Sequence, residues 1–140
     1  MNSEQRTVNN KNTIGVWRLE DSILIIKSKA FAIRIIKLYK YLCNEKREYI
    51  LSKQILRSGT SIGANIREAA FAQSANDFIS KMSISLKEVS ETQYWLELLH
   101  ETDYITDKEA DSLKSDCMDL LRILQASIIT AKLNKKKSKV

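Results

Sequence analysis

The sequence predicts an all-α protein folded as a single antiparallel, up-down-up-down four-helix bundle. The 140 residues contain no proline and only three glycines, so the turn signals of strands and hairpins are missing. Four segments carry apolar residues at spacings of three and four, the period of a helix with one buried face. Short polar stretches separate these segments, and helices joined by short loops pack as antiparallel neighbours.

The start of the bundle allows two alternatives. Residues 1–22 are polar and aperiodic, and we expect a flexible segment there, ahead of a bundle at residues 23–133. The apolar run at residues 23–26 is either an extended arm on the bundle, which we favour, or the first turn of the first helix. Ser28 is the candidate N-cap of that helix.

The first helix is expected to run to about Glu45. Its apolar seam is Phe31, Ile35, Leu38 and Leu42. A second face carries Lys27, Arg34, Lys37 and Tyr41. That basic face is either ordinary solvated surface or a surface for phosphates.

The second helix is expected from about Tyr49 to Ala72, and it contains two glycines. One seam is Leu51, Ile55, Ser58, Ile62, Asn65 and Ala69; the adjacent seam is Leu56, Gly59, Gly63, Ile66 and Ala70. Glycine inside a helix costs about 0.8–1.0 kcal/mol relative to alanine. We attribute Gly59 and Gly63 to the close approach of another backbone.

A row of polar residues also follows the second helix. It comprises Ser58, Ser61, Asn65 and Glu68, at spacings of three and four. We interpret it as a buried hydrogen-bonded network that fixes the helix register. A ligand site built from the same row is the alternative.

The third helix is expected to begin at a capping box formed by Ser74 and Asp77 and to end near Glu101. Its seam is Ile79, Met82, Leu86, Val89, Gln93 and Leu96. A different face carries Ile84, Glu88, Glu91, Trp95 and Leu98. Tryptophan, isoleucine and leucine among acidic residues indicate a second buried contact.

The fourth helix opens with a capping box at Thr106 and Glu109. Its seam is Ala110, Leu113, Cys117, Leu120, Leu124, Ser127 or Ile128, and Ala131. Beyond it, residues 134–140 are expected to form a frayed basic tail containing Lys135, Lys136 and Lys137.

The net charge of +6 hides an uneven distribution. Residues 22–73 carry ten basic residues against three acidic ones, whereas residues 74–129 carry five against eleven. Five lysines follow in residues 130–140. The chain therefore has a basic front half, an acidic back half and a basic end.

Catalytic motifs are not found, and we expect neither enzymatic activity nor a metal or cofactor. Glu97 and His100 match one Glu-x-x-His unit of di-iron bundles, but such a site needs two units and the chain has a single histidine. A helix-turn-helix with its turn at Gly59 is the minor alternative, and the unbroken seam through residues 51–69 argues against it. Cys43 and Cys117 are expected to be free thiols of a cytosolic protein, with no membrane-spanning segment.

Four stretches of the chain together carry a resemblance to a known family. They are residues 29–42, Leu51-Ser52-Lys53-Gln54-Ile55-Leu56-Arg57-Ser58-Gly59-Thr60-Ser61-Ile62-Gly63-Ala64-Asn65-Ile66, and residues 77–82 and 91–96. In these stretches the sequence resembles the bacterial four-helix-bundle proteins encoded in 23S rRNA intervening sequences. The resemblance covers roughly residues 23–133. The resemblance implies a ring-like homopentamer. The sequence is also similar to the accessory protein of diversity-generating retroelements, a basic barrel that binds nucleic acid and a reverse transcriptase.

Two functions of different classes remain. The first is an oligomeric interaction protein whose basic faces bind RNA, a nucleic-acid enzyme or another acidic partner, without a base-reading motif. Its RNA-binding candidates are Lys27, Arg34, Lys37, Lys135, Lys136 and Lys137, and its oligomer-interface candidates are Lys53, Arg57, Arg67, Glu88, Glu91 and Trp95. In that hypothesis the third helix of one subunit packs on the second helix of the next, with Trp95 as the anchor. The competing hypothesis is a structural or scaffolding homo-oligomer without nucleic acid.

Overall fold

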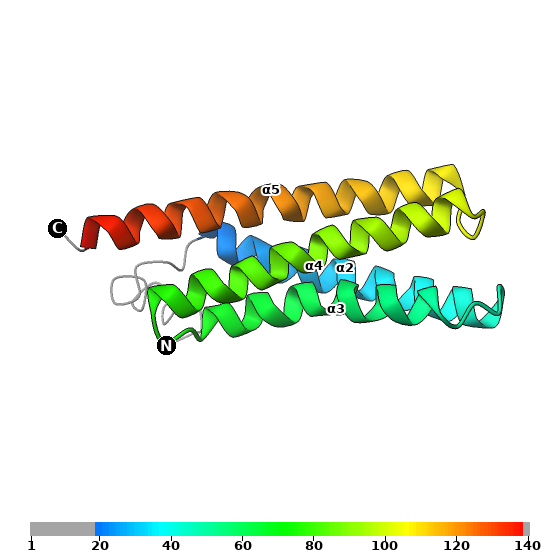
Figure 1. Cartoon of the computed structure of the whole chain (residues 1–140), viewed down its shortest axis with the longest axis horizontal. Helices are drawn as coiled ribbons and strands as arrows, with labels where there is room; N and C mark the ends of the chain where they lie inside the picture. The colour runs from blue at the N-terminus through cyan, green and yellow to red at the C-terminus, as the bar shows by residue number, and fades with distance from the viewer. Residues whose placement is uncertain (1–18, 139–140) are drawn as a thin grey trace.

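The computed structural model describes residues 19–138, and side chains from residue 22 to residue 137. Within that range the chain forms four helices, α2 (Leu19–Asn44), α3 (Leu51–Ala70), α4 (Ala75–Glu101) and α5 (Asp107–Ser138). Figure 1 shows each helix reversing the direction of the one before it, as in the predicted up-down-up-down bundle. Each helix packs against its neighbours in chain order, and α5 packs back against α2. Our expectations for residues 1–18 and 139–140 lie outside the described residues.

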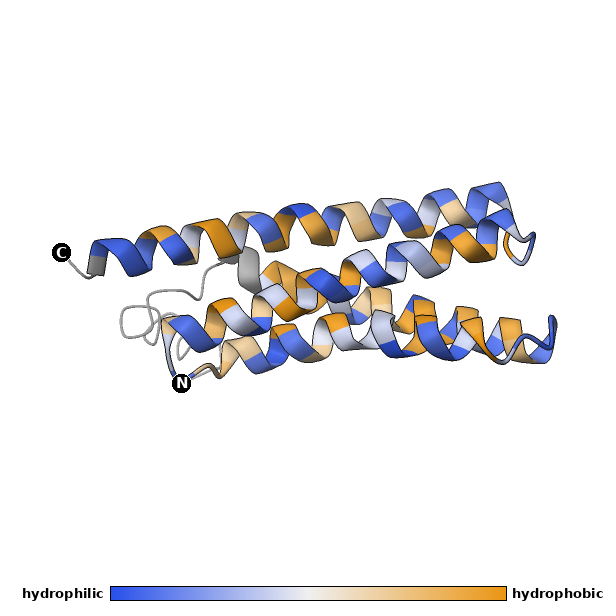
Figure 2. Ribbon diagram, viewed as in Figure 1, coloured by the Kyte–Doolittle hydropathy of each residue, from blue (hydrophilic) through white to orange (hydrophobic). Residues whose placement is uncertain are grey.

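The buried positions of the helices repeat at spacings of three and four, and they confirm the seams predicted for the first and last helices. On α2 the buried residues are Leu24, Ser28, Phe31, Ile35, Leu38 and Leu42; on α5 they include Ala110, Leu113, Cys117, Leu120, Leu124 and Ile128. Figure 2 shows apolar and polar residues alternating around each helix accordingly. The core therefore lies along the bundle axis.

The buried face of α4 is rotated relative to the predicted seam. Its buried residues are Phe78, Met82, Ser85, Val89, Thr92, Leu96 and Leu99. Ile79, Leu86 and Gln93 are only half-buried. The prediction missed Ser85 and Thr92 because both are polar, yet each makes a hydrogen bond inside the core. Ser85 Oγ donates to the carbonyl oxygen of Ile62 at 2.9 Å, and Thr92 Oγ1 donates to Ser58 Oγ at 2.8 Å.

The ends of α2 and α5 correct three expectations. Residues 23–26 are helical, because α2 already begins at Leu19, so the extended arm is wrong. Ser28 is not an N-cap: it lies inside α2, where its hydroxyl donates back to Ile25 O at 3.3 Å. Lys135, Lys136 and Lys137 lie in the last turns of α5, which continues to Ser138 instead of fraying at residue 134. Lysines at this end complement the helix dipole.

The helix starts are held by side-chain caps, two of which were predicted. Asp77 N donates to Ser74 Oγ at 3.0 Å, and Glu109 N donates to Thr106 Oγ1 at 3.2 Å. The cap of α3 was missed: the buried Glu48 carboxylate accepts the backbone N–H groups of residues 50, 51 and 52, at 2.9, 2.7 and 3.0 Å. The helix then runs unbroken from Leu51 to Ala70, which excludes a helix-turn-helix at Gly59.

Candidate interaction surfaces

The uneven charge of the sequence becomes a charge difference between two sides of the bundle. The neighbouring helices α2 and α3 carry the basic front half, and the neighbouring helices α4 and α5 carry most of the acidic half. The two sides meet along two lines, where α2 packs on α5 and where α3 packs on α4. Ion pairs cross both lines.

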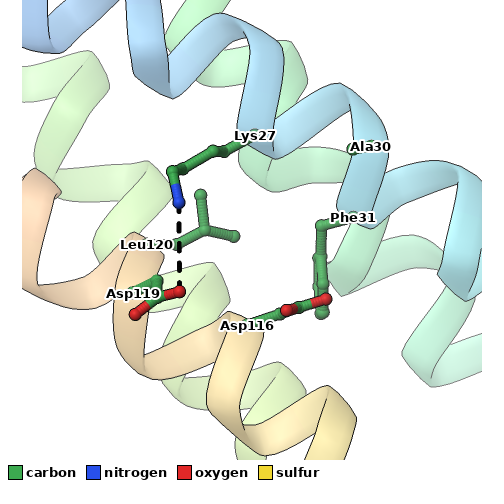
Figure 3. Close-up of a pocket in the computed structure, with 6 residues that line it drawn as sticks. All are labelled: Lys27, Ala30, Phe31, Asp116, Asp119 and Leu120. Atoms are coloured by element: carbon green, nitrogen blue, oxygen red, sulfur yellow. Dashed lines mark ion pairs between the residues drawn. The ribbon is translucent and has the colours of Figure 1, made fainter.

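Along the α2–α5 line, two predicted RNA-binding residues already have acidic partners. Arg34 Nη1 lies 2.6 Å from Asp116 Oδ2, and its other terminal nitrogen donates to Ser112 Oγ at 2.9 Å. Lys27 Nζ lies 3.9 Å from Asp119 Oδ2, at the mouth of a groove of about 110 Å³. Figure 3 shows Lys27 reaching over this groove, with Phe31 beside Asp116.

The other predicted RNA-binding residues are differently placed. Lys37 is exposed on α2, and between residues 22 and 137 it makes no ion pair with an acidic side chain. Lys136 and Lys137 are exposed near the end of α5, and Lys135 beside them is half-buried. The six candidates thus do not form one stripe: two take part in internal ion pairs, and the lysines of α5 form a separate basic end.

Along the α3–α4 line, the structure brings three predicted interface residues together within one chain. Arg57 Nη2 donates to both carboxylate oxygens of Glu91, at 2.7 and 2.9 Å, and Arg57 Nη1 lies 3.9 Å from Glu88. Lys53 and Arg67 are exposed on the same side of α3 as Arg57. Part of the charge expected to act between subunits is therefore neutralised inside the subunit.

Trp95 and Glu88 each have a buried polar side-chain atom that has no hydrogen-bond partner. Trp95 is half-buried against the core. Its Nε1 is shielded from solvent, and no protein acceptor lies within hydrogen-bond distance of it. The same holds for Glu88 Oε2. Burial raises the pKa of Glu88, and a hydrogen bond with Glu91 and its negative charge raise it further, whereas Arg57 lowers it. The carboxylate of Glu88 is thus an unfavourable charge at this position.

The polar row on α3 does not form the expected network. Ser61 Oγ donates to the carbonyl of Arg57 at 2.6 Å, and Asn65 Nδ2 donates to the carbonyl of Ser61 at 2.9 Å. Glu68 instead faces Lys81 of α4, with 3.8 Å between Oε2 and Nζ. Only Ser58 is joined to another helix by a hydrogen bond, through Thr92. Hydroxyl and amide groups inside a helix bond readily to the preceding turn, and this local alternative prevails here.

No catalytic constellation stands out among residues 22–137. Among the side chains that the structure describes, no three histidine, cysteine, aspartate or glutamate residues are grouped so that they could hold a metal ion. His100 Nε2 contacts Asp107 Oδ1 at 2.6 Å where α4 gives way to α5. Cys43 is half-buried and Cys117 is buried, and neither forms a disulfide. None of the described helices has a stretch long and apolar enough to cross a membrane.

Comparison with known proteins decides the family. The chain matches the 23S rRNA-intervening sequence protein family over residues 20–126. The chain belongs to this family. The match confirms the resemblance drawn from the glycine-containing helix and from the segments at residues 77–82 and 91–96.

A solved structure agrees with the family assignment. It is the crystal structure of a protein of unknown function from the S23 ribosomal protein family of Bacteroides thetaiotaomicron, 54% identical in sequence. The alignment covers 79% of this chain and 98% of that one, with a TM-score of 0.78. No curated protein gives a significant match. The family thus fixes the fold and assigns no activity, and any functional statement must come from the surfaces described above.

Proposed function

We propose that this member of the 23S rRNA-intervening sequence protein family is a non-enzymatic interaction protein that binds RNA electrostatically. The observation that carries the proposal is the composition of the second half of α5. From Leu120 to Ser138 this helix contains five basic residues and no acidic residue. Four of the five are exposed, namely Arg122, Lys132, Lys136 and Lys137. Such a cluster attracts a phosphate backbone without reading its sequence.

Binding of a labelled RNA hairpin, followed by fluorescence anisotropy, tests the proposal. We expect binding at low salt that weakens steeply as salt is added. The variant Lys136→Glu/Lys137→Glu should bind more weakly and with a shallower salt dependence. Lys108→Glu is the matched control, because Lys108 is also exposed on α5 but lies between Asp107 and Glu109. Absence of binding at low salt, or equal losses in both variants, contradicts the proposal.

We further propose that the chain assembles with itself, as the family resemblance implies for a homopentamer. The charge difference between the two sides of the bundle supports a contact in which α3 of one subunit meets α4 of the next. A contact between unlike faces closes into a ring when the rotation allows. On α3, Lys53 and Arg67 keep exposed charge for this contact, and Ala64 between them leaves room for the Trp95 ring of a neighbouring subunit.

Mass measurement by light scattering tests the assembly. Trp95→Ala should lower the mass, while Tyr94→Ala, at the exposed neighbouring position, should not. Because Trp95 also packs on the core, Lys53→Glu/Arg67→Glu provides a second variant that leaves the core intact. If both variants keep the wild-type mass, neither Trp95 nor the α3 charges hold subunits together.

A purely structural or scaffolding oligomer is the second candidate. The observation in its favour is that Lys27, Arg34 and Arg57 are used in ion pairs within the subunit. The absorbance ratio at 260 and 280 nm of the purified protein separates the two functions, since only the first predicts co-purified nucleic acid.

A further inference from the structure

Helix α2 carries a second seam on the side opposite the core, and no element among the described residues covers it. Residues 26, 29, 33, 36 and 40 repeat at spacings of three and four, like the core seam, but are displaced about 200° around the helix. Three of the five are isoleucines, with exposed fractions of 70% for Ile26, 45% for Ile33 and 38% for Ile36. Helices pack against one another through side chains that repeat at these spacings.

The charge of this outer seam specifies the partner. Lys29 and Lys40 complete it, both exposed, and no acidic residue occurs anywhere in residues 22–44. A second α2 packed on the seam would set lysines against lysines, which is unfavourable. A helix with apolar residues at the same spacing and glutamates on its flanks would bury the isoleucines and pair with the lysines.

The pattern fits a protein helix better than the other polyanionic surfaces. Aliphatic side chains neither stack on bases nor bond to phosphates, so RNA gives the three isoleucines no role. Helices that lie on membranes separate an apolar face from a basic face. Here isoleucines and lysines share one stripe, and the opposite face of α2 is already buried in the core.

We propose that the outer seam of α2 is a docking site for an acidic amphipathic helix of another protein. The site is distinct from the basic end of α5 that carries the proposed RNA binding. Docking at one does not require the other.

A synthetic peptide tests the proposal directly. The probe is a fluorescent helix of three heptads with leucine at positions a and d and glutamate at e and g; the glutamates keep it from pairing with itself. We expect saturable binding to the full chain. Ile26→Gln/Ile33→Gln should weaken it about tenfold or more, because two buried isoleucine contacts are lost. Lys29→Glu/Lys40→Glu should weaken it too, through like-charge repulsion.

Matched controls distinguish binding at this site from non-specific hydrophobic binding. Ile129→Gln/Leu133→Gln removes comparably exposed apolar side chains from α5 and should leave peptide binding unchanged. A peptide of the same composition with its heptad order scrambled should not bind. Binding of the scrambled peptide, or an equal loss in the α5 variant, overturns the proposal.

Three outcomes would assign the seam to another occupant and overturn the helix partner. In one, the peptide does not bind, whereas phosphatidylserine vesicles bind the wild-type chain and fail to bind the Ile26→Gln/Ile33→Gln variant. Another is displacement of bound peptide by the RNA hairpin. The third is a lower solution mass of the Ile26→Gln/Ile33→Gln variant, which would place a second copy of the chain on the seam.

Discussion

Gly59 of α3 lies directly against Ile35 of α2. A Cβ atom added at Gly59 would stand 2.8 Å from Ile35 Cγ2 and 2.9 Å from Cγ1, closer than carbon atoms can pack. At Gly63, one turn later, the added atom would stand 3.1 Å from Ser28 Oγ. We expected another backbone to approach both glycines. At Gly59 the three nearest atoms are all side-chain atoms of Ile35, whereas at Gly63 the backbone carbonyl carbon of Ser28 also lies 3.6 Å from the added atom. Gly59 thus sets how closely α2 and α3 approach.

Gly59→Ala should destabilise the protein despite the better helix propensity of alanine. Overpacking costs about 1–3 kcal/mol, and the propensity gain of about 1 kcal/mol offsets only part of it. Gly63→Ala should be milder, because its closest neighbour is a serine hydroxyl. Urea denaturation measures both. In an Ile35→Ala background the penalty of Gly59→Ala should disappear; if it persists, Ile35 is not the cause.

Residues such as Phe31 and Leu120 show what the sequence could predict. Their spacing of three and four placed them in the core, and both are buried. Ser85 and Thr92 were missed because burial of a hydroxyl depends on a partner in another helix, which periodicity does not reveal. Ion pairs such as Arg34 with Asp116 join residues from opposite ends of the chain. Predicting that pair requires knowing how both helices are rotated about their axes. The charge distribution along the sequence shows only that the two halves of the chain carry opposite net charge.

Glu48 should contribute to stability although it lies outside every helix. Its buried carboxylate accepts three backbone N–H groups at the start of α3, and the left-handed Arg47, with φ of 51°, turns the chain into this cap. Glu48→Ala should cost about 1–3 kcal/mol in urea denaturation, because a charged cap and its buried hydrogen bonds are lost. Glu45→Ala, at an exposed position in the same loop, should change little. Equal effects of the two variants would show that the cap is not the source.

Cys117 should resist alkylation in the folded protein while Cys43 reacts. Burial raises the pKa of the Cys117 thiol to about 12, with a further contribution from the charge of Asp116. Almost no thiolate is therefore present at neutral pH, and the thiolate is the reactive form. Iodoacetamide labelling followed by mass spectrometry should find Cys117 modified only in denaturant. In a Cys43→Ser variant, any labelling then reports opening of the bundle. Rapid modification of Cys117 without denaturant would mean that α5 is loosely packed.

Glu88→Gln should stabilise the protein, and more so as the pH rises. The raised pKa of Glu88 means that the folded state binds its proton more tightly than the unfolded state does. Below the ordinary value of 4.5 both states are protonated and the group contributes nothing. As the pH rises from there through the raised pKa, the folded state must either hold a proton that the unfolded state has released or bury a negative charge. The free energy of unfolding therefore falls. Glutamine avoids this loss. The difference in Tm between variant and wild type should therefore grow from about pH 4 to about pH 7. Glu97→Gln, which removes the same charge at an exposed position on α4, is the control. If Glu88→Gln is less stable at neutral pH, the contact with Arg57, 3.9 Å away, outweighs the burial of the carboxylate.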